Sequence, residues 1–407
     1  PYTTLFRSWI ARYLGPEQFG LMSYSVAFVA LFATFSTLGL DDIVVRGIIS
    51  DPQKRESYLG TTLVLKFFGS LAMIIFSIIG ISIVERDSSM LRLFVLILSF
   101  GYVFKSLDII DLWFRSQVQS QYSVYARSIS FVIVSILKII LILTKAPLIA
   151  FVIMYSLDFF LSAVFLIFFY KKNSSTSMSK WKIQKDMAKE LIGSSWPLFL
   201  GGLALTVESE IDQVLLKNMI GAEELGLYSA SLKVILSFSF ICIVLRSSFL
   251  PSIISAKKVS EELYQRKLEQ FYQMMMIIFL LIAVPLVIFK NPVIQLLYGK
   301  EYLNAAAILP LMSIRLFFTH YSTARAIYLL NENLLKYSFF TTLIGAITNI
   351  VLNMYLIPIY SSTGAIIAFI VSFVVTVFLI DLIYPKTRKN AWIMIRSTFN
   401  FYKLFIK

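Results

Sequence analysis

The sequence is poor in the residues on which most catalytic and metal-binding chemistry depends. Its 407 residues include one cysteine, Cys242, and one histidine, His320, and charged residues make up only 15%. A single cysteine excludes a disulfide framework and most cysteine-based metal sites. No GxxxxGK(S/T) phosphate loop, HExxH motif or nucleophile elbow occurs, so the chain has no means of hydrolysing ATP itself. The sequence therefore predicts no enzyme activity, no cofactor and no metal site.

Long apolar runs make up most of what is present. Hydrophobic residues account for 58% of the chain, which is too much for a soluble protein of this length to keep away from water. Because about 20 apolar residues cross a bilayer and must do so as a helix, the runs predict an all-α integral membrane protein. We expect eleven complete spans, at residues 19–40, 58–84, 91–113, 122–143, 147–170, 191–217, 225–249, 269–290, 303–330, 335–357 and 363–384.

One signature occurs twice in the chain. YLGPEQFGLMSYSVAF at 13–28 matches MIGAEELGLYSASLKV at 219–234, with six identities at a constant offset of 206, and LIAFVIMYSLDFF at 148–160 resembles IIAFIVSFVVTVF at 366–378. Repeats of this size in a hydrophobic chain are typical of secondary transporters. The second copy follows a long apolar run, whereas few residues precede the first. We therefore expect a twelve-helix fold whose first helix is truncated, with residues 1–8 not native.

The distribution of lysine and arginine predicts the topology. When the loops are assigned alternately to two sides, one side collects 23 basic residues and the other seven. The positive-inside rule then places the 171–189 loop and the C-terminus in the cytoplasm. The predicted domains are an N-terminal transmembrane lobe at 1–170, a basic cytoplasmic linker at 171–189, a C-terminal transmembrane lobe at 190–385 and a basic amphipathic cytoplasmic tail at 386–407. Six helices per lobe predict a pseudo-twofold axis along the membrane normal.

Several charged residues fall inside the apolar runs, where charge is costly unless it faces water or a partner. Lys105 with Asp108, and Asp111 with Arg115, have helical spacing, so we expect local pairing there. Other basic residues have no acidic neighbour at that spacing, and we expect them to line a water-filled path and hold an anionic group; these are Lys66, Lys233, Arg315 and Arg325.

Three further residues are candidates for coupling to an ion. Glu208 and Asp212 are four residues apart and carry the same sign. Unless they are exposed near the membrane surface, they need a cation from another helix, a bound cation or a proton. His320 is either a packed polar residue or a proton carrier. Whether H⁺, Na⁺ or neither couples transport stays open.

A family resemblance follows from these motifs. The runs WIARYLGPEQFGLMSYSVAFVALFATFSTLGLDDIVVR, DIIDLWFRSQVQSQYSVYAR, EIDQVLLKNMIGAEELGLYSAS and LYGKEYLNAAAILPL resemble the Wzx-type polysaccharide biosynthesis flippases of the multidrug/oligosaccharidyl-lipid/polysaccharide exporter superfamily. The resemblance implies two six-helix lobes in a V shape and alternating access. It also implies a polyprenyl-diphosphate oligosaccharide as substrate, for O-antigen, capsule or exopolysaccharide synthesis. Asp212 matches an aspartate in the family's seventh span.

Competing functions use the same fold. A multidrug and toxin exporter would carry cationic amphiphiles and should have an acidic lumen, and a lipid II flippase is the nearest neighbour in chemistry. A non-transporting scaffold in a polysaccharide assembly complex is a third possibility. The expected location is the cytoplasmic membrane of a bacterium or archaeon. Expected partners are membrane lipids, a coupling ion and the polysaccharide polymerase and chain-length machinery. Nucleic acid is not expected, and we expect a monomer.

Overall fold

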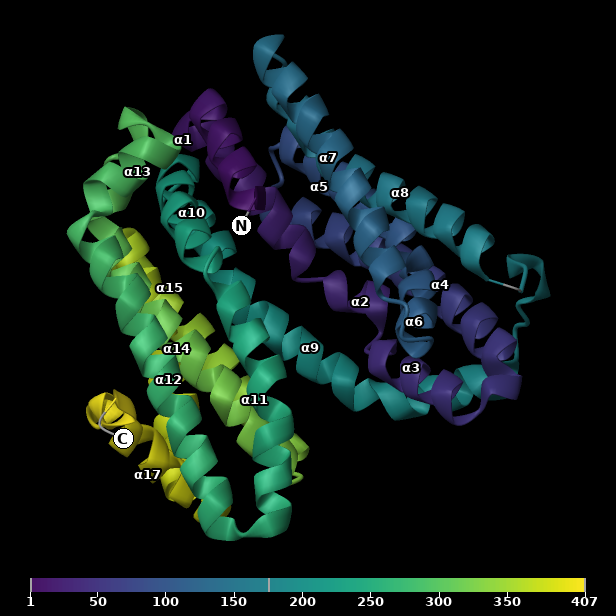
Figure 1. Ribbon diagram of the computed structural model, residues 1–407. Coiled ribbons are helices and arrows are strands. Elements are labelled where there is room, and N and C mark those ends of the chain that lie inside the picture. The colour runs from purple at the N-terminus through teal and green to yellow at the C-terminus, as the bar shows by residue number, and fades with distance from the viewer. Residues whose placement is uncertain (1, 175, 406–407) are drawn as a thin grey trace. The chain divides into compact units, whose positions relative to one another are not determined.

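The computed structural model describes residues 2–174 and 176–405, and every regular element among them is helical (Figure 1). The chain divides into two compact units. The N-terminal unit comprises Leu21–Ile211, and the C-terminal unit comprises the residues up to Gly20 together with those from Asp212 onward. The boundaries fall inside two long helices, α1 (Tyr2–Ala30) and α9 (Lys185–Met219). The lobe boundaries expected from the sequence stay a prediction.

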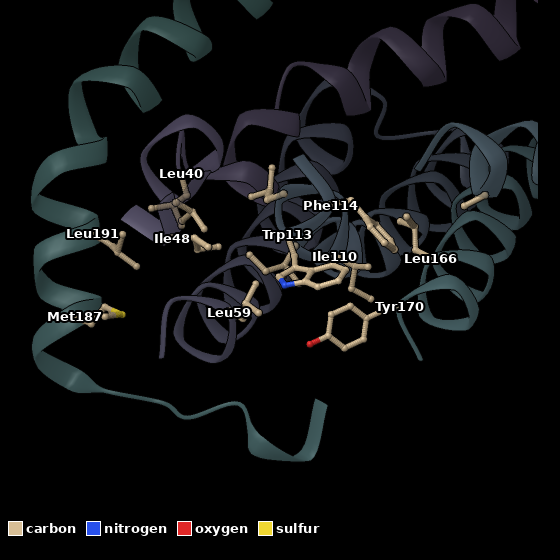
Figure 2. Packing of buried hydrophobic residues seen from close by; sticks show 14 residues of the cluster. Leu40, Ile48, Leu59, Ile110, Trp113, Phe114, Leu166, Tyr170, Met187 and Leu191 are labelled. Atoms are coloured by element: carbon tan, nitrogen blue, oxygen red, sulfur yellow. The ribbon is translucent and has the colours of Figure 1, made fainter. Parts of the chain in front are cut away.

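The N-terminal unit is a bundle of helices between α1 and α9. In chain order these are α2 (Ala33–Thr37), α3 (Asp41–Ser50), η1 (Pro52–Lys54), α4 (Arg55–Val84), α5 (Ser89–Lys105), η2 (Ser106–Asp108), α6 (Ile109–Ser116), α7 (Gln121–Leu143), α8 (Leu148–Asn173) and η3 (Met178–Lys180). Helix α8 packs against α5 and α7, and α4 packs against α5. The core gathers around Trp113 and Tyr170, with Met187 and Leu191 of α9 closing one side (Figure 2).

The predicted linker at 171–189 packs against the N-terminal unit. The amide of Lys182 donates to the carbonyl of Glu56 (3.1 Å), and the amide of Gln184 donates to the hydroxyl of Thr61 (3.0 Å). These two bonds fix the linker against the first turns of α4.

The C-terminal unit contains the remaining helices. These are α10 (Ala222–Leu236), α11 (Ser239–Val259), α12 (Glu261–Ile288), α13 (Lys290–Tyr298), η4 (Lys300–Tyr302), α14 (Ala305–Asn331), α15 (Leu335–Phe373), the π-helical η5 (Val374–Leu379), α16 (Ile380–Ile383), α17 (Pro385–Phe399) and η6 (Phe401–Phe405). Helix α12 packs against α11, α14 and α17. The tail helix α17 buries Asn390 and Met394, whereas Trp392 on its other face is exposed, as an amphipathic segment requires.

Several predicted spans are broken by local backbone geometry. The run at 19–40 is divided between α1, which ends at Ala30, and α2 (Ala33–Thr37), and Leu38 (φ 53°) and Gly39 (φ 66°) adopt the left-handed region before α3. The run at 225–249 is divided between α10 and α11. The gap predicted between the spans 335–357 and 363–384 agrees with the structure, because Ser361 (φ 53°, ψ −136°) interrupts the helix there. The run at 91–113 is divided between α5 and α6 by the 3-10 turn η2, and elsewhere the helix ends agree with the predicted spans to within several residues.

In the part of the chain that the structure describes, fewer helices meet the length and hydropathy expected of a membrane span than the eleven predicted from the sequence. Among the described residues, eight helices are long and apolar enough to cross a membrane, or nine if the bent pair Ser8–Ala30 and Ala33–Ser50 counts as one span. Helix α14 matches the predicted span 303–330 in length but is not among them. It carries Arg315, His320 and Arg325, which lower its hydropathy. The all-helical membrane fold is confirmed, and the arrangement of six helices per lobe stays a prediction.

The two copies of the repeated signature contact each other within the C-terminal unit. The third residue of each copy is a glycine with positive φ, Gly15 at 74° and Gly221 at 134°, after which the chain enters a new helix. A Cβ at Gly20 would overlap the carbonyl oxygen of Ala222, and a Cβ at Gly226 would overlap that of Pro16. The contact is reciprocal, so the signature's second glycine is required for close helix approach in both copies.

Candidate functional site

Arg315 is the centre of a buried polar cluster in the C-terminal unit. Its Nη1 donates to Oδ2 of Asp212 on α9 (2.8 Å) and to the hydroxyl of Tyr228 on α10 (2.8 Å). The Tyr228 hydroxyl in turn donates to the same carboxylate. The guanidinium carbon lies 3.7 Å from the ring centroid of Phe369 on α15. Four helices therefore position this one cation.

The cluster is deeply buried, which sets its electrostatics. Asp212 is 0% exposed and Arg315 6% exposed. Removing two charges from water is costly, and close pairing with added hydrogen bonds is what offsets that cost. The hydroxyl of Tyr228 and the face of Phe369 supply those added contacts. The cluster can therefore hold a positive and a negative charge inside the protein, and either charge alone would be strongly disfavoured.

Arg325, ten residues further along α14, forms a second buried cluster. Its Nε donates to Oδ2 of Asp381 (2.8 Å) and its Nη2 to Oδ1 (2.7 Å), so the pair is bidentate. The Tyr337 hydroxyl also donates to Oδ1 (2.7 Å), and Nη2 contacts the hydroxyl of Thr341 (3.3 Å). Asp381 follows the π-helical segment η5, which is a rare geometry that often accompanies functional positions.

These contacts correct one step of the sequence reasoning. Arg315 and Arg325 have no acidic neighbour at helical spacing, but each is paired with a carboxylate from a distant helix, Asp212 or Asp381. For Asp212, the structure selects the first of the three possibilities left open by the sequence, a cation from another helix. Both carboxylates were visible in the sequence as charges inside apolar runs. Tyr228 carried no such signal, because tyrosine is common in membrane helices.

The local pairs predicted in the N-terminal unit are wrong. Asp111 pairs with Arg127 on α7 (3.1 Å) rather than with Arg115, and Arg115 pairs with Asp42 (3.2 Å). Within the described part of the chain, the Lys105 ammonium has no carboxylate at salt-bridge distance. It lies over the rings of Tyr102 (4.9 Å) and Phe159 (5.2 Å). The helix ends at Lys105 and resumes beyond Asp108, so spacing within an unbroken helix does not apply there.

Lys66 is the third buried cation with a defined partner. It lies on α4, is 2% exposed, and its Nζ contacts Oδ1 of Asp41 at 2.6 Å. The Asp41 side chain, at the start of α3, is 42% exposed. Asp41 therefore reaches the surface of the N-terminal unit, whereas Lys66 is buried inside it.

The remaining predicted residues take different environments. Lys233 is half-buried on α10, and Glu208 is buried on α9. His320 is 0% exposed, and its Nδ1 contacts the carbonyl oxygen of Leu316 (2.6 Å). Its Nε2 has no hydrogen-bond partner among the described residues. A search of the same residues finds no group of three or more histidine, cysteine, aspartate and glutamate side chains that could hold a metal ion.

The sequence matches known proteins over most of its length. Residues 9–307 match the sequence profile of a family described as "Polysaccharide biosynthesis protein". A Shigella flexneri protein described as "Putative O-antigen transporter" is 25% identical over 335 residues, which cover 76% of each chain.

Solved structures share the fold at low sequence identity. An inward-facing multidrug resistance transporter of the MATE family, in the MOP superfamily, superposes with a TM-score of 0.77 and 12% identity, covering 100% of this chain and 95% of the other. The lipid II flippase MurJ in an inward closed conformation gives 0.73 and 15%, covering 100% and 93%. A MOP superfamily transporter from Pyrococcus furiosus gives 0.62 and 13%, covering 98% and 92%. The chain is a multi-pass membrane protein with this transporter fold, and these relatives are transporters or flippases rather than enzymes.

Proposed function

The chain belongs to this polysaccharide biosynthesis protein family, and we propose that it is a flippase for polyprenyl-diphosphate-linked oligosaccharides. It would move the repeat unit from the cytoplasmic to the outer leaflet of the cytoplasmic membrane by alternating access, for O-antigen, capsule or exopolysaccharide synthesis. The C-terminus would be cytoplasmic. The observation that carries the proposal is the family match over residues 9–307, supported by the O-antigen transporter relative.

Physical chemistry supports this class of substrate. A diphosphate with an oligosaccharide cannot enter hydrocarbon without a polar path, whereas its polyprenyl tail is already soluble in lipid. The chain keeps an unusual number of charged side chains inside apolar helices, and buried cations are present in both units, Lys66 in one and Arg315 and Arg325 in the other. Ionisable residues at membrane depth are costly and mark transport pathways.

The Arg315–Asp212 pair suggests how an anionic head could be recognised. We assign Arg315 to the diphosphate and Asp212 to the coupling ion. Protonation of Asp212, or a cation bound beside it, would neutralise the carboxylate and release the guanidinium for phosphate oxygens, which it suits by geometry. The substrate would then compete for Arg315 and the coupling ion for Asp212, so both would act on the same ion pair. The Tyr228 hydroxyl is hydrogen-bonded to both Arg315 and Asp212, so it would keep a bond to one of them after the ion pair separates.

The other candidate residues complete the proposed path. Lys66 and Lys233 would contribute positive charge along it, and Arg325 would contribute both charge and structural support through its two bonds to Asp381. Glu208 and His320 are secondary candidates for ion coupling. Membrane lipids and the polysaccharide assembly machinery remain the proposed partners.

The direct test is translocation in reconstituted vesicles. The probe is a fluorescent polyprenyl diphosphate bearing N-acetylglucosamine, glucose or galactose, and the accessible leaflet is read by chemical quenching. Arg315→Ala alone would leave Asp212 as an uncompensated buried charge, so the informative variant is Arg315→Met with Asp212→Leu. We expect this double variant to fold and to lose at least about tenfold in translocation rate, since about 1.4 kcal/mol of lost stabilisation corresponds to tenfold.

Two results would contradict parts of the proposal. A wild-type protein that moves none of the lipid-linked sugars would refute the flippase function, and export of a cationic dye by the same vesicles would identify a multidrug exporter instead. A double variant with wild-type translocation would remove Arg315 from the substrate path. Asp212→Asn tests coupling separately, because its rate should no longer respond to an imposed proton or sodium gradient.

A further inference from the structure

A polar cavity of about 290 Å³ lies wholly within the N-terminal unit and takes no part in the clusters described above. Its lining residues come from the end of α5, η2, α7 and α8, and they are Lys105, Asp108, Arg127, Asp158, Phe159 and Ser162. The volume falls just below the range of about 300–1,000 Å³ typical of ligand pockets, so the cavity suits a small group.

The cavity wall carries both signs of charge. Lys105 lies over the rings of Tyr102 and Phe159, at 4.9 and 5.2 Å, and no carboxylate of the described residues reaches it. Asp158 accepts a hydrogen bond from the hydroxyl of Ser130 through Oδ1 (2.6 Å). Arg127 pairs with Asp111, which lies outside the lining (3.1 Å). Donors and acceptors of full charge therefore face one small space.

The presence of both basic and acidic side chains in the cavity wall limits the kinds of ligand that the cavity can bind. A phosphate would meet the carboxylates of Asp108 and Asp158, and an organic cation would meet Lys105 and Arg127. An apolar molecule would strip water from all four charges without replacing their hydrogen bonds, which is strongly unfavourable. A polyhydroxylated ring both donates and accepts hydrogen bonds, so it can satisfy ammonium, guanidinium and carboxylate groups together.

Phe159 adds a second feature that suits a sugar. Its ring packs edge-on against Tyr102 with centroids 5.1 Å apart, and the side chain also lines the cavity. The C–H groups on the face of a pyranose ring are weakly positive and apolar, and an aromatic face is negative, so the two attract. Phe159 therefore offers apolar aromatic surface beside charged hydrogen-bonding groups, an arrangement that suits a sugar ring.

We propose that this cavity binds one sugar residue of the oligosaccharide head. The inference deepens the proposed flippase function and rests on it for the identity of the ligand. Phe159 would stack on the ring, and Lys105 would donate to ring hydroxyls while Asp158 accepts from them. Recognition of the sugar would then differ in chemistry from recognition of the diphosphate.

The test compares two sets of lipids at equilibrium with the protein in lipid nanodiscs. The first set is polyprenyl diphosphate bearing one N-acetylglucosamine, glucose or galactose, and the second is bare polyprenyl diphosphate. We expect the wild type to bind at least one sugar-bearing lipid more tightly than the bare lipid. Phe159→Leu and Asp158→Asn should each reduce that preference about three- to tenfold and leave the affinity for the bare lipid within about twofold.

A matched control lies on the same helix. Phe160 lines a separate apolar groove of about 460 Å³ between α5 and α8 rather than the polar cavity, so Phe160→Leu should keep the sugar preference. Because Asp158→Asn retains an acceptor for Ser130, it tests the charge without removing the fold contact. Each variant is checked for folding by its melting profile and by its affinity for bare polyprenyl diphosphate.

The outcomes separate this inference from the proposed function. A wild type that binds all lipids equally, or variants that keep the preference, would overturn the sugar site even if translocation is observed. A sugar preference abolished by Phe159→Leu but not by Phe160→Leu would support the site. That result would hold even if no lipid is translocated in vesicles, which would count against the flippase function alone.

Discussion

Arg325 and Asp381 allow the energetics of the C-terminal unit to be tested by a double-mutant cycle. The perturbations are Arg325→Met, Asp381→Leu and the two together, which exchange a buried ion pair for apolar side chains of similar length. Asp381 is 0% exposed and accepts two bonds from Arg325, at 2.7 and 2.8 Å, and one from Tyr337. Each single variant therefore leaves one charge buried and without its partner.

The expected magnitude follows from this geometry. Two unit charges about 4 Å apart at an effective dielectric constant near 20 attract by about 4 kcal/mol. Removing one member of a buried pair typically costs about 3–5 kcal/mol, because the desolvated partner remains. Replacing both members avoids that penalty, so the double variant should lie within about 2 kcal/mol of the wild type. The coupling energy of the cycle should therefore be at least about 3 kcal/mol.

The assay is reversible unfolding in mixed detergent and SDS micelles, followed by circular dichroism. Both single variants should unfold at markedly lower SDS fractions than the double variant. Additive losses, with a coupling energy below about 1 kcal/mol, would refute the reasoning, because they would mean that water reaches the pair. Translocation by the stable double variant then separates the two roles of Arg325. A wild-type rate would leave it purely structural.

Two further predictions concern close packing and the Arg315 cluster. Gly20→Ala should destabilise the protein by at least about 1–3 kcal/mol, because its Cβ would overlap the carbonyl of Ala222. Gly193→Ala is the control and should stabilise the protein by about 0.5–1 kcal/mol, because no atom lies near the added Cβ. Thermal melting in detergent compares the two variants, and equal shifts in melting temperature would disprove the close contact between Gly20 and Ala222. Tyr228→Phe removes a hydroxyl bonded to both charges of its cluster, so it should cost about 1.5–3 kcal/mol in the SDS assay, and an unchanged midpoint would contradict this.

Much of the fold could be predicted from the sequence because its signals are local. Hydrophobic runs and basic loops can be identified from neighbouring residues, and the repeat from a direct match between two stretches of sequence. Together they indicated a helical membrane protein of the transporter type. Breaks inside runs were missed. The break at Leu38 and Gly39 lies inside the predicted run 19–40, whereas the break at Ser361 falls in the gap predicted between the spans 335–357 and 363–384.

The candidate site was predicted only in part because its partners are distant along the chain. Arg315 and Asp212 are 103 residues apart, and Arg325 and Asp381 are 56 apart. The sequence identified the charges and the cost of burying them, but the choice of partner depends on how helices pack. The expected Asp111–Arg115 pair failed for the same reason, since Arg127 on another helix is better placed.

Gly20 packs on Ala222, and Gly226 packs on Pro16. These reciprocal contacts restrict which substitutions either copy of the signature can accept. Each copy of the signature packs directly on the other, so a substitution that adds bulk in one copy disturbs the backbone of the other. A side chain at the second glycine of either copy would therefore require a compensating shift of the backbone on which that glycine packs in the other copy.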